Sequence, residues 1–184
     1  MTTGTRKAPE RIETSRLILR RPRVQDAEEV FARYAGDREV SRYLAWRLHE
    51  SPATTRAFLE FSDAEWERWP AGPYLVESRE DGRLLGGSGF AFETPYRAST
   101  GYVFARDAWG QGFATEVVRA QVEIARAMGL ARLYALCHVD HAASTRVLEK
   151  SGFTQEGVLR RYLEFPNVGT GGPADVFCYA WIFV

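Results

Sequence analysis

Near the amino terminus, apolar and polar residues follow first the period of a strand and then that of a helix. Residues 16–20, RLILR, have the short period of a half-buried strand, and Pro22 ends it. Residues 24–35 carry acidic side chains in the first turn and apolar side chains three and four positions apart, and Gly36 follows them. This pattern predicts a strand followed by a helix.

Two further helices are expected before the chain changes its pattern. A short one is predicted over residues 38–44, and a longer one over residues 54–68 after the pair Ser51 and Pro52. The expected apolar stripe of the longer helix consists of Phe58, Phe61, Ala64 and Trp66. Such a stripe is expected to pack on a sheet.

Three strand-like runs follow, at residues 74–77, 84–92 and 101–105. Turn signals at residues 80–82 and 94–95 separate them, so neighbouring runs are expected to pair as antiparallel hairpins.

The second half of the chain alternates helices with strands. A helix over residues 112–128, with apolar side chains on one face, is ended by Gly129. The later elements are predicted as a strand at 132–137, a helix at 144–150 and strands at 153–162 and 174–184. This order predicts the mixed α/β (α+β) class, with helices on the faces of one sheet.

Composition limits the domain count and the kinds of partner. The chain has 184 residues, of which 45% are hydrophobic, enough for the core of one domain at residues 11–184 behind a flexible polar arm at residues 1–10. Basic and acidic residues are balanced at 24 each, which argues against nucleic acid and an anionic membrane as partners. The two cysteines lack CxxC spacing, and no signal or membrane-spanning run is present, so we expect a cytoplasmic protein.

A glycine turn between a predicted strand and a predicted helix is the most informative segment. Gly110 and Gly112 allow a ligand to approach the backbone, and the helix that follows offers unpaired N–H groups at its positive end. Such a turn can bind phosphate, although an ordinary strand-to-helix turn has the same local pattern. The GxxxxGK[ST] phosphate loop is absent, and Thr115 stands where a dinucleotide fingerprint needs its third glycine.

Two blocks of this sequence resemble the GNAT acetyltransferases, and within them the branch of RimJ/RimL-like ribosomal-protein N-terminal acetyltransferases. Residues 109–114, WGQGFA, occupy the family's pyrophosphate motif [Q/R]-x-x-G-x-[G/A]. Residues 141–153, HAASTRVLEKSGF, resemble the branch's N-x-x-S-x-R-V-L-E-K-x-G-F. The resemblance extends over residues 11–184 and implies a central, mostly antiparallel mixed sheet of six to seven strands flanked by about four helices.

The resemblance also implies acetyl-CoA as co-substrate, without a metal. Its pyrophosphate would lie on the amides of the glycine turn, and its pantetheine arm would pair along the preceding strand end. The implied cofactor-binding residues are Phe104, Ala105, Arg106, Gly110, Gln111, Gly112, Phe113, Ala114, Thr115, His141, Ser144 and Arg146.

The mechanism that the resemblance implies is direct attack of a primary amine on the thioester, without an acyl-enzyme. Ser144 stands where the branch supplies a hydroxyl to the departing thiolate, so it is the candidate general acid, and helix capping is the alternative role for this serine. His141 replaces the family's asparagine and, since histidine titrates near neutrality, its protonation is expected to tune activity. Ser99 stands where an acidic residue often lies.

The general base therefore remains open between two carboxylates and water. Glu93 at the end of a hairpin strand and Glu156 on a later strand are the tentative bases, although both positions also suit solvated surface charges. Cys137, His138 and His141 could suggest a metal site, but a fourth ligand is not in sight.

The acceptor is a primary amine, either of a small molecule or of a protein or peptide N-terminus. Tyr43, Trp46 and Tyr96 are the candidate acceptor contacts. Two other hypotheses stay open: a non-catalytic acyl-CoA-binding sensor module and a nucleotide-binding Rossmann-type protein. The oligomeric state is expected to be monomer or homodimer.

Overall fold

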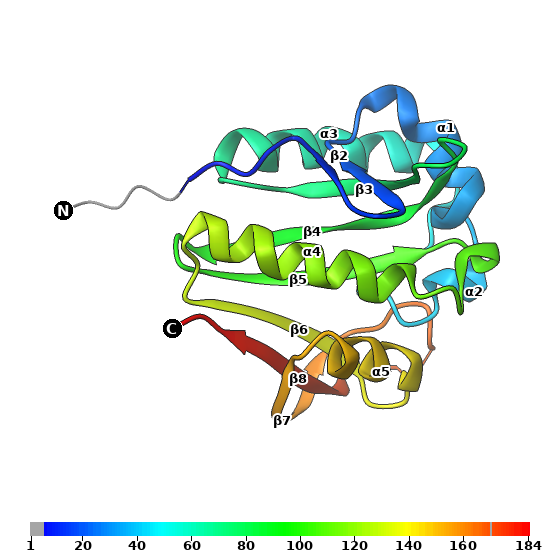
Figure 1. Ribbon diagram of the computed structural model, residues 1–184. Coiled ribbons are helices and arrows are strands. Elements are labelled where there is room, and N and C mark those ends of the chain that lie inside the picture. The colour runs from blue at the N-terminus through cyan, green and yellow to red at the C-terminus, as the bar shows by residue number, and fades with distance from the viewer. Residues whose placement is uncertain (1–5, 170) are drawn as a thin grey trace.

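The computed structural model describes residues 6–169 and 171–184, so half of the predicted arm at residues 1–10 lies outside the described residues. Its centre is one eight-stranded sheet with the strand order β1-β2-β3-β4-β5-β6-β8-β7 (Figure 1). The strands are β1 (Arg11–Glu13), β2 (Leu17–Arg20), β3 (Pro73–Ser78), β4 (Leu84–Thr94), β5 (Arg97–Phe104), β6 (Arg132–His138), β7 (Thr154–Leu163) and β8 (Ala174–Ile182). The predicted mixed α/β class is confirmed.

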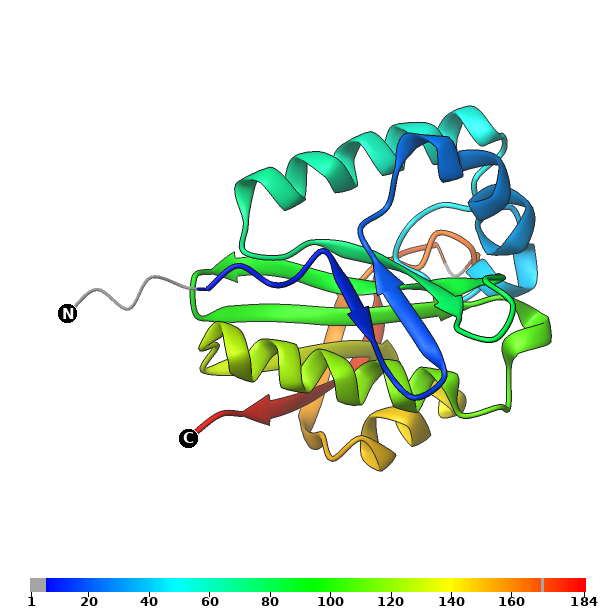
Figure 2. The ribbon, with the colours of Figure 1, turned by 45° about the horizontal axis from the view of Figure 1, so that its top comes forward.

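Helices cover both faces of the sheet. Figure 2 shows α1 and α3 above the sheet and α4 and α5 below it. The helices are α1 (Ala27–Val30), α2 (Arg38–Ser41), α3 (Pro52–Arg68), α4 (Phe113–Met128) and α5 (Ala142–Lys150). The predicted helix at residues 24–35 is a continuous helical segment that passes from a 3-10 turn through α1 into a π-helical turn.

The sheet has one strand more than the upper end of the expected range. The additional strand is β1, which pairs antiparallel with β2 so that Arg11 lies opposite Arg20. Three residues are too few to show a two-residue period, so the sequence pattern did not predict it.

The expected apolar stripe of α3 is partly wrong. The buried residues of this helix are Thr55, Leu59, Ser62 and Trp66, at the spacing of one helix face. Phe61, which we expected in the stripe, is 58% exposed. By contrast, α4 buries Val117, Ile124 and Met128 as predicted, and Gly129 ends it in the left-handed conformation.

Strands β5 and β6 separate from each other part of the way along. They are the parallel neighbours of the sheet, and their pairing runs only from Arg97–Arg132 to Ser99–Tyr134. Beyond Ser99, β5 stays paired with β4 and β6 stays paired with β8. The carboxyl ends of both strands lead to the first turns of α4 and α5, which is where open α/β sheets bind ligands.

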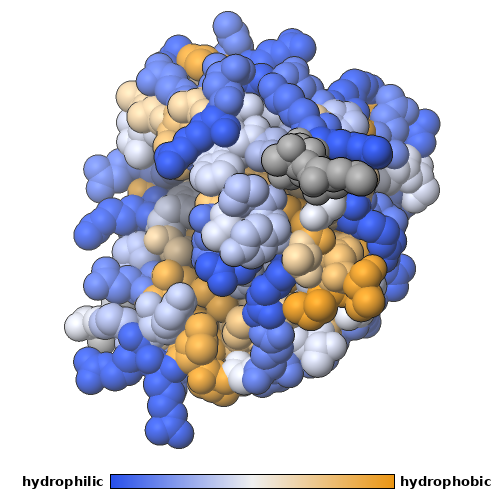
Figure 3. Space-filling view, turned by 90° about the vertical axis from the view of Figure 1, so that its left-hand side faces the viewer, coloured by the Kyte–Doolittle hydropathy of each residue, from blue (hydrophilic) through white to orange (hydrophobic). Residues whose placement is uncertain are grey.

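The first described residues, from Arg6, and the carboxyl terminus lie on the same side of the molecule. Figure 3 shows this side, where apolar groups break a surface that is otherwise mostly polar and charged. Within the described residues, none of the helices has both the length and the apolar character needed to span a bilayer.

Candidate active site

The glycine turn before α4 presents a row of free backbone donors. Gly110 and Gly112 have φ angles of 74° and 79°, in the left-handed region that favours glycine. In the part of the chain that the structure describes, the N–H groups from Gly110 to Thr115 donate to no acceptor, and no side chain caps the helix. These donors and the helix dipole together make the turn a candidate anion site.

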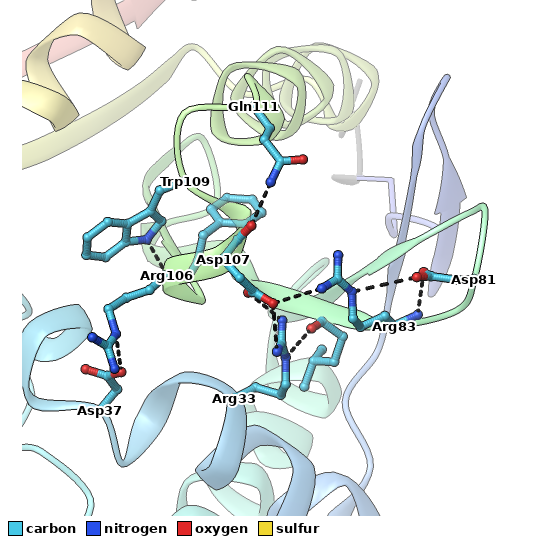
Figure 4. A network of polar contacts seen from close by, with 10 residues as sticks. Arg33, Asp37, Asp81, Arg83, Arg106, Asp107, Trp109 and Gln111 are labelled. Carbon is cyan, nitrogen blue, oxygen red and sulfur yellow. Dashed lines mark hydrogen bonds and ion pairs between the residues drawn. The ribbon is translucent and has the colours of Figure 1, made fainter.

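Ion pairs behind this turn hold it in place (Figure 4). Both carboxylate oxygens of Asp107 accept from Arg33, at 2.8 and 3.1 Å, and Arg83 donates to the same carboxylate at 2.8 Å. The Arg33 hydrogen bonds lower the pKa of Asp107. The Gln111 side chain donates to the Asp107 carbonyl at 2.6 Å, which ties the far side of the turn to this network.

The Arg106 side chain, expected in the cofactor site, is directed elsewhere. Its guanidinium pairs with Asp37 at 2.8 Å and with Glu39 at 3.2 Å, so it joins the turn to α2 (Figure 4).

Glu116 joins the first turn of α4 to the loop between β1 and β2. Its carboxylate accepts from Thr14 at 2.6 Å and from the backbone and side chain of Arg16 at 2.9 and 2.7 Å. Burial alone would raise the pKa of Glu116, but these hydrogen bonds outweigh it and lower the pKa to about 2. Glu116, which suits the positive end of the helix, is thus also the anchor of a neighbouring hairpin.

We name the cavity beside the glycine turn the turn cavity. It has a volume of about 530 Å³ and is lined by Tyr102, Val103, Phe104, Gly110, Gly112, Phe113, Ala114, Thr115, His141 and Ser144, among others. Arg42, Arg146 and Lys150 also line it, and within the described residues none of these three cations forms an ion pair. Most of the predicted cofactor residues are therefore brought together around one cavity with uncompensated positive charge.

The free edge of β5 includes Phe104, which was expected to bind the cofactor, but not Ala105. The N–H of Ala105 donates to Leu85, its carbonyl accepts from Ala108, and the carbonyl of Phe104 accepts from the Trp109 indole at 2.7 Å. Since antiparallel pairing alternates, the backbone groups of Tyr102 and the N–H of Phe104 point into the gap toward β6. An added strand would therefore pair at Tyr102 and Phe104, and not at Ala105.

Ser144 lies in the first turn of α5 and contacts Tyr102. Its Oγ is 2.9 Å from the Tyr102 hydroxyl and does not cap the helix. Burial raises the pKa of Tyr102, so the phenol keeps its proton. Tyr102 was not among the predicted site residues, although its strand position, two residues before Phe104, places it on the same face.

His141 lies against an aromatic ring. It stacks on Tyr43 with a centroid distance of 4.8 Å and an interplanar angle of 24°. Burial lowers the pKa of His141, and the neighbouring His138 and Arg146 act in the same direction. These effects favour the neutral imidazole relative to a free histidine side chain.

The two tentative bases lie away from the turn cavity and in ion pairs. Glu156 pairs with Arg132, whose hydrogen bonds lower the pKa of Glu156. Glu93 pairs with Arg97 at 2.7 Å and accepts a hydrogen bond from Tyr134. The lowered pKa of Glu156 makes its carboxylate a weaker proton acceptor. The structure does not bring either residue together with Ser144.

A second cavity, which we name the sheet cavity, lies between the sheet and helices α1 and α3. It has a volume of about 430 Å³, and its lining includes Trp46, one of the predicted acceptor contacts. Tyr102 and Val103 line both cavities, so the two border the same segment of β5. Tyr96, another predicted contact, is 60% exposed in the β4–β5 turn and lines neither.

Cys137 is a buried neutral thiol. Burial raises its pKa to about 11, which leaves almost no thiolate at neutral pH. Among residues 6–169 and 171–184, no three side chains of His, Cys, Asp or Glu gather as they would around a metal ion.

Comparisons with known proteins agree on one family. The family model described as "Acetyltransferase (GNAT) domain" matches residues 16–154. The uncharacterized N-acetyltransferase YoaA of Bacillus subtilis is 36% identical over 172 residues, which cover 92% of this chain and 94% of YoaA. A GNAT-family acetyltransferase structure from Bacillus anthracis has a TM-score of 0.81 at 25% identity and covers 94% of this chain and 98% of its own. RimL, an L7/L12 alpha-N-protein acetyltransferase solved with coenzyme A, shares the fold with a TM-score of 0.81 at 24% identity over 95% of this chain and 98% of its own.

Proposed function

The chain belongs to the GNAT family of acetyltransferases, and from this premise we propose that it transfers the acetyl group of acetyl-CoA to a primary amine by direct attack. The observation that carries this proposal is the position of the Ser144–Tyr102 hydroxyl pair. The pair lies in the turn cavity, beside the free amide donors, and Tyr102 also lines the sheet cavity.

We place the pyrophosphate of acetyl-CoA on the N–H groups from Gly110 to Thr115. Arg146 and Lys150 supply positive charge for the remaining phosphate oxygens. The backbone groups of Tyr102 and Phe104 that point into the β5–β6 gap pair with the amides of the pantetheine arm. This arrangement directs the thioester toward Ser144.

Ser144 then protonates the leaving group. The amine nitrogen forms a bond to the thioester carbonyl carbon, the carbon–sulfur bond breaks, and the thiolate takes the hydroxyl proton of Ser144. Tyr102, which is protonated and 2.9 Å away, returns a proton to Ser144. The amine attacks in its neutral form, because an α-amino group with a pKa near 8 is already about a tenth neutral at pH 7. As the amide forms, its nitrogen loses a second proton to water, and solvent returns a proton to Tyr102. The buried thiol of Cys137 is too little ionised to form an acyl-enzyme.

The acceptor class follows from the family and from RimL. RimL is named for acetylating the N-terminus of a ribosomal protein. We accordingly propose that the acceptor is a protein or peptide N-terminus or a small-molecule amine. Either kind of acceptor would bind in the sheet cavity.

Release of coenzyme A in the presence of amines tests the proposal. Ser144→Ala is expected to lower kcat by about 100-fold or more, as loss of a general acid does, while the Kd for acetyl-CoA from calorimetry stays within about twofold. Thr145→Ala is the matched control, because it removes a hydroxyl from the next position of α5, bonded to Ala142 and outside both cavities.

A different result would support the alternative function, a module that binds acyl-CoA without catalysis. Tight acetyl-CoA binding by the wild type, with no amine-dependent release of coenzyme A and no effect of Ser144→Ala, would identify a non-catalytic acyl-CoA-binding sensor module.

A further inference from the structure

The strands beneath the sheet cavity contribute several residues with little or no side chain to its lining. Gly87 and Gly89 of β4 and Gly101 of β5 line it, together with Ala91 and Ser99. A Cβ built on Gly101 would meet no atom within 4 Å, and its φ lies outside the left-handed region. The backbone does not require glycine at this position, so the missing side chain serves to leave space above the strand.

Aromatic side chains form the wall of this cavity. Phe58, Phe61 and Glu65 of α3 line it at the spacing of one helix face. Trp46 lies against His49 with ring centroids 4.9 Å apart, and His49 lies 6.1 Å from Phe58. The exposed position of Phe61 is explained in this way, because the residue lines a cavity and not the core.

The lining carries very little charge. Glu65 is its one ionised side chain among the described residues, and no arginine or lysine lines it. Burial lowers the pKa of His49, whose Nδ1 is 2.8 Å from the Thr55 hydroxyl, so this ring is neutral at pH 7. An anionic group would lose its hydration here without gaining a cation, which disfavours phosphorylated or carboxylated acceptors.

Tyr102 and Val103 line both cavities, so the sheet cavity borders the same segment of β5 as the reaction centre. A molecule with its amine at the thioester therefore extends over the glycine floor. The volume of about 430 Å³ lies in the range of small-ligand pockets, roughly 300–1,000 Å³.

We propose that the acceptor is a primary amine that carries a large apolar, aromatic group next to the amine and no negative charge in that group. This inference rests on the proposed acetyl transfer and names the acceptor class of the same site. Both a free arylalkylamine and a peptide with an aromatic first residue present this chemistry.

The test compares matched acceptors with wild type and two variants. The free acceptors are 2-phenylethylamine and ethylamine, and the peptide acceptors begin with Phe or Ser and are otherwise identical. Gly101→Val fills the floor of the sheet cavity. Gly157→Val of β7 is the matched control, because a Cβ there also meets no atom within 4 Å and Gly157 lines neither cavity.

Wild type is expected to prefer the aromatic member of at least one pair by about tenfold or more in kcat/KM. Burial of an aromatic group in an apolar pocket gives a preference of this size. Gly101→Val is expected to lower that ratio at least about tenfold, mainly through KM, and Gly157→Val to leave it unchanged. The pair that shows the preference identifies the source as free amine or peptide.

Equal kcat/KM for both members of each pair, or a ratio unaffected by Gly101→Val, would overturn the acceptor class. Calorimetric binding of 2-phenylethylamine and of the Phe-first peptide to the CoA-loaded protein provides a second measurement, and binding of neither would also overturn it. Failure to bind acetyl-CoA at all would instead overturn the proposed function.

Discussion

Replacing Gly110 by aspartate would place a negative charge at the free amides of the glycine turn. The position has a left-handed φ of 74°, and an added Cβ meets no atom within 4 Å. The folded protein is therefore expected to lose only about 1–2 kcal/mol from backbone strain, which lowers Tm by about 2–8 °C for a chain of this size. Steric damage to the rest of the domain is not expected.

The effect on binding is electrostatic. Two unit charges 4 Å apart repel by about 1 kcal/mol in water and by about 4 kcal/mol at an effective dielectric constant of 20. Gly110 is exposed, so the lower figure applies, and the pyrophosphate carries about two charges. The expected loss is at least about 2 kcal/mol, or about 30-fold in the Kd for acetyl-CoA.

Gly129→Asp at the other end of α4 is the matched control. Gly129 also has a left-handed φ, of 80°, and an added Cβ there would meet no atom within 4 Å. It lines neither cavity. Aspartate at the negative end of the helix costs at least as much stability as at position 110. Calorimetry should therefore show normal acetyl-CoA binding by Gly129→Asp. A Kd for Gly110→Asp within about threefold of wild type would refute the pyrophosphate site.

Two further substitutions test the electrostatics of the site. Glu116→Gln should lower the free energy of unfolding by about 1–3 kcal/mol at pH 7. Because the pKa of Glu116 is about 2 in the folded protein and about 4.5 in the unfolded chain, the difference in unfolding free energy between variant and wild type should shrink as the pH falls from 5 toward 2. Urea titrations measure this difference, and a constant value would contradict the pKa shift. His141→Asn should leave the pH profile of kcat/KM unchanged between pH 7 and 9, because burial already lowers the pKa of His141; loss of a wild-type inflection in that range would show that the imidazole titrates there.

Local periodicity was sufficient to predict most of the elements and the glycine turn. The helix at residues 112–128 and the strand at residues 132–137 agree closely with α4 and β6, because strong amphipathic patterns and glycine stops report local structure directly. The anion site was also predictable, because it depends on one contiguous segment.

Features that depend on contacts between distant strands were not predictable in this way. Ion pairing of Glu156 with Arg132 follows from the order of the last strands in the sheet, and the hydroxyl pair of Tyr102 and Ser144 depends on the separation of β5 from β6. Phe58 and Phe61 were assigned to the core because helical spacing shows which face of a helix is apolar, but not whether that face meets a packed sheet or a hollow floor.

The Asp107 network has a consequence for how tightly the turn can hold a ligand. Arg33 and Arg83 bind the carboxylate of Asp107 just before the turn, and the Gln111 side chain binds back to the Asp107 carbonyl. The loop therefore reaches its binding geometry during folding, and a ligand need not order it on arrival. This preorganisation favours affinity, since the entropy of immobilising the loop is not lost again on binding. It also links affinity to ionic strength through charges that never touch the ligand, because the ion pairs at Asp107 are exposed to solvent and salt weakens them.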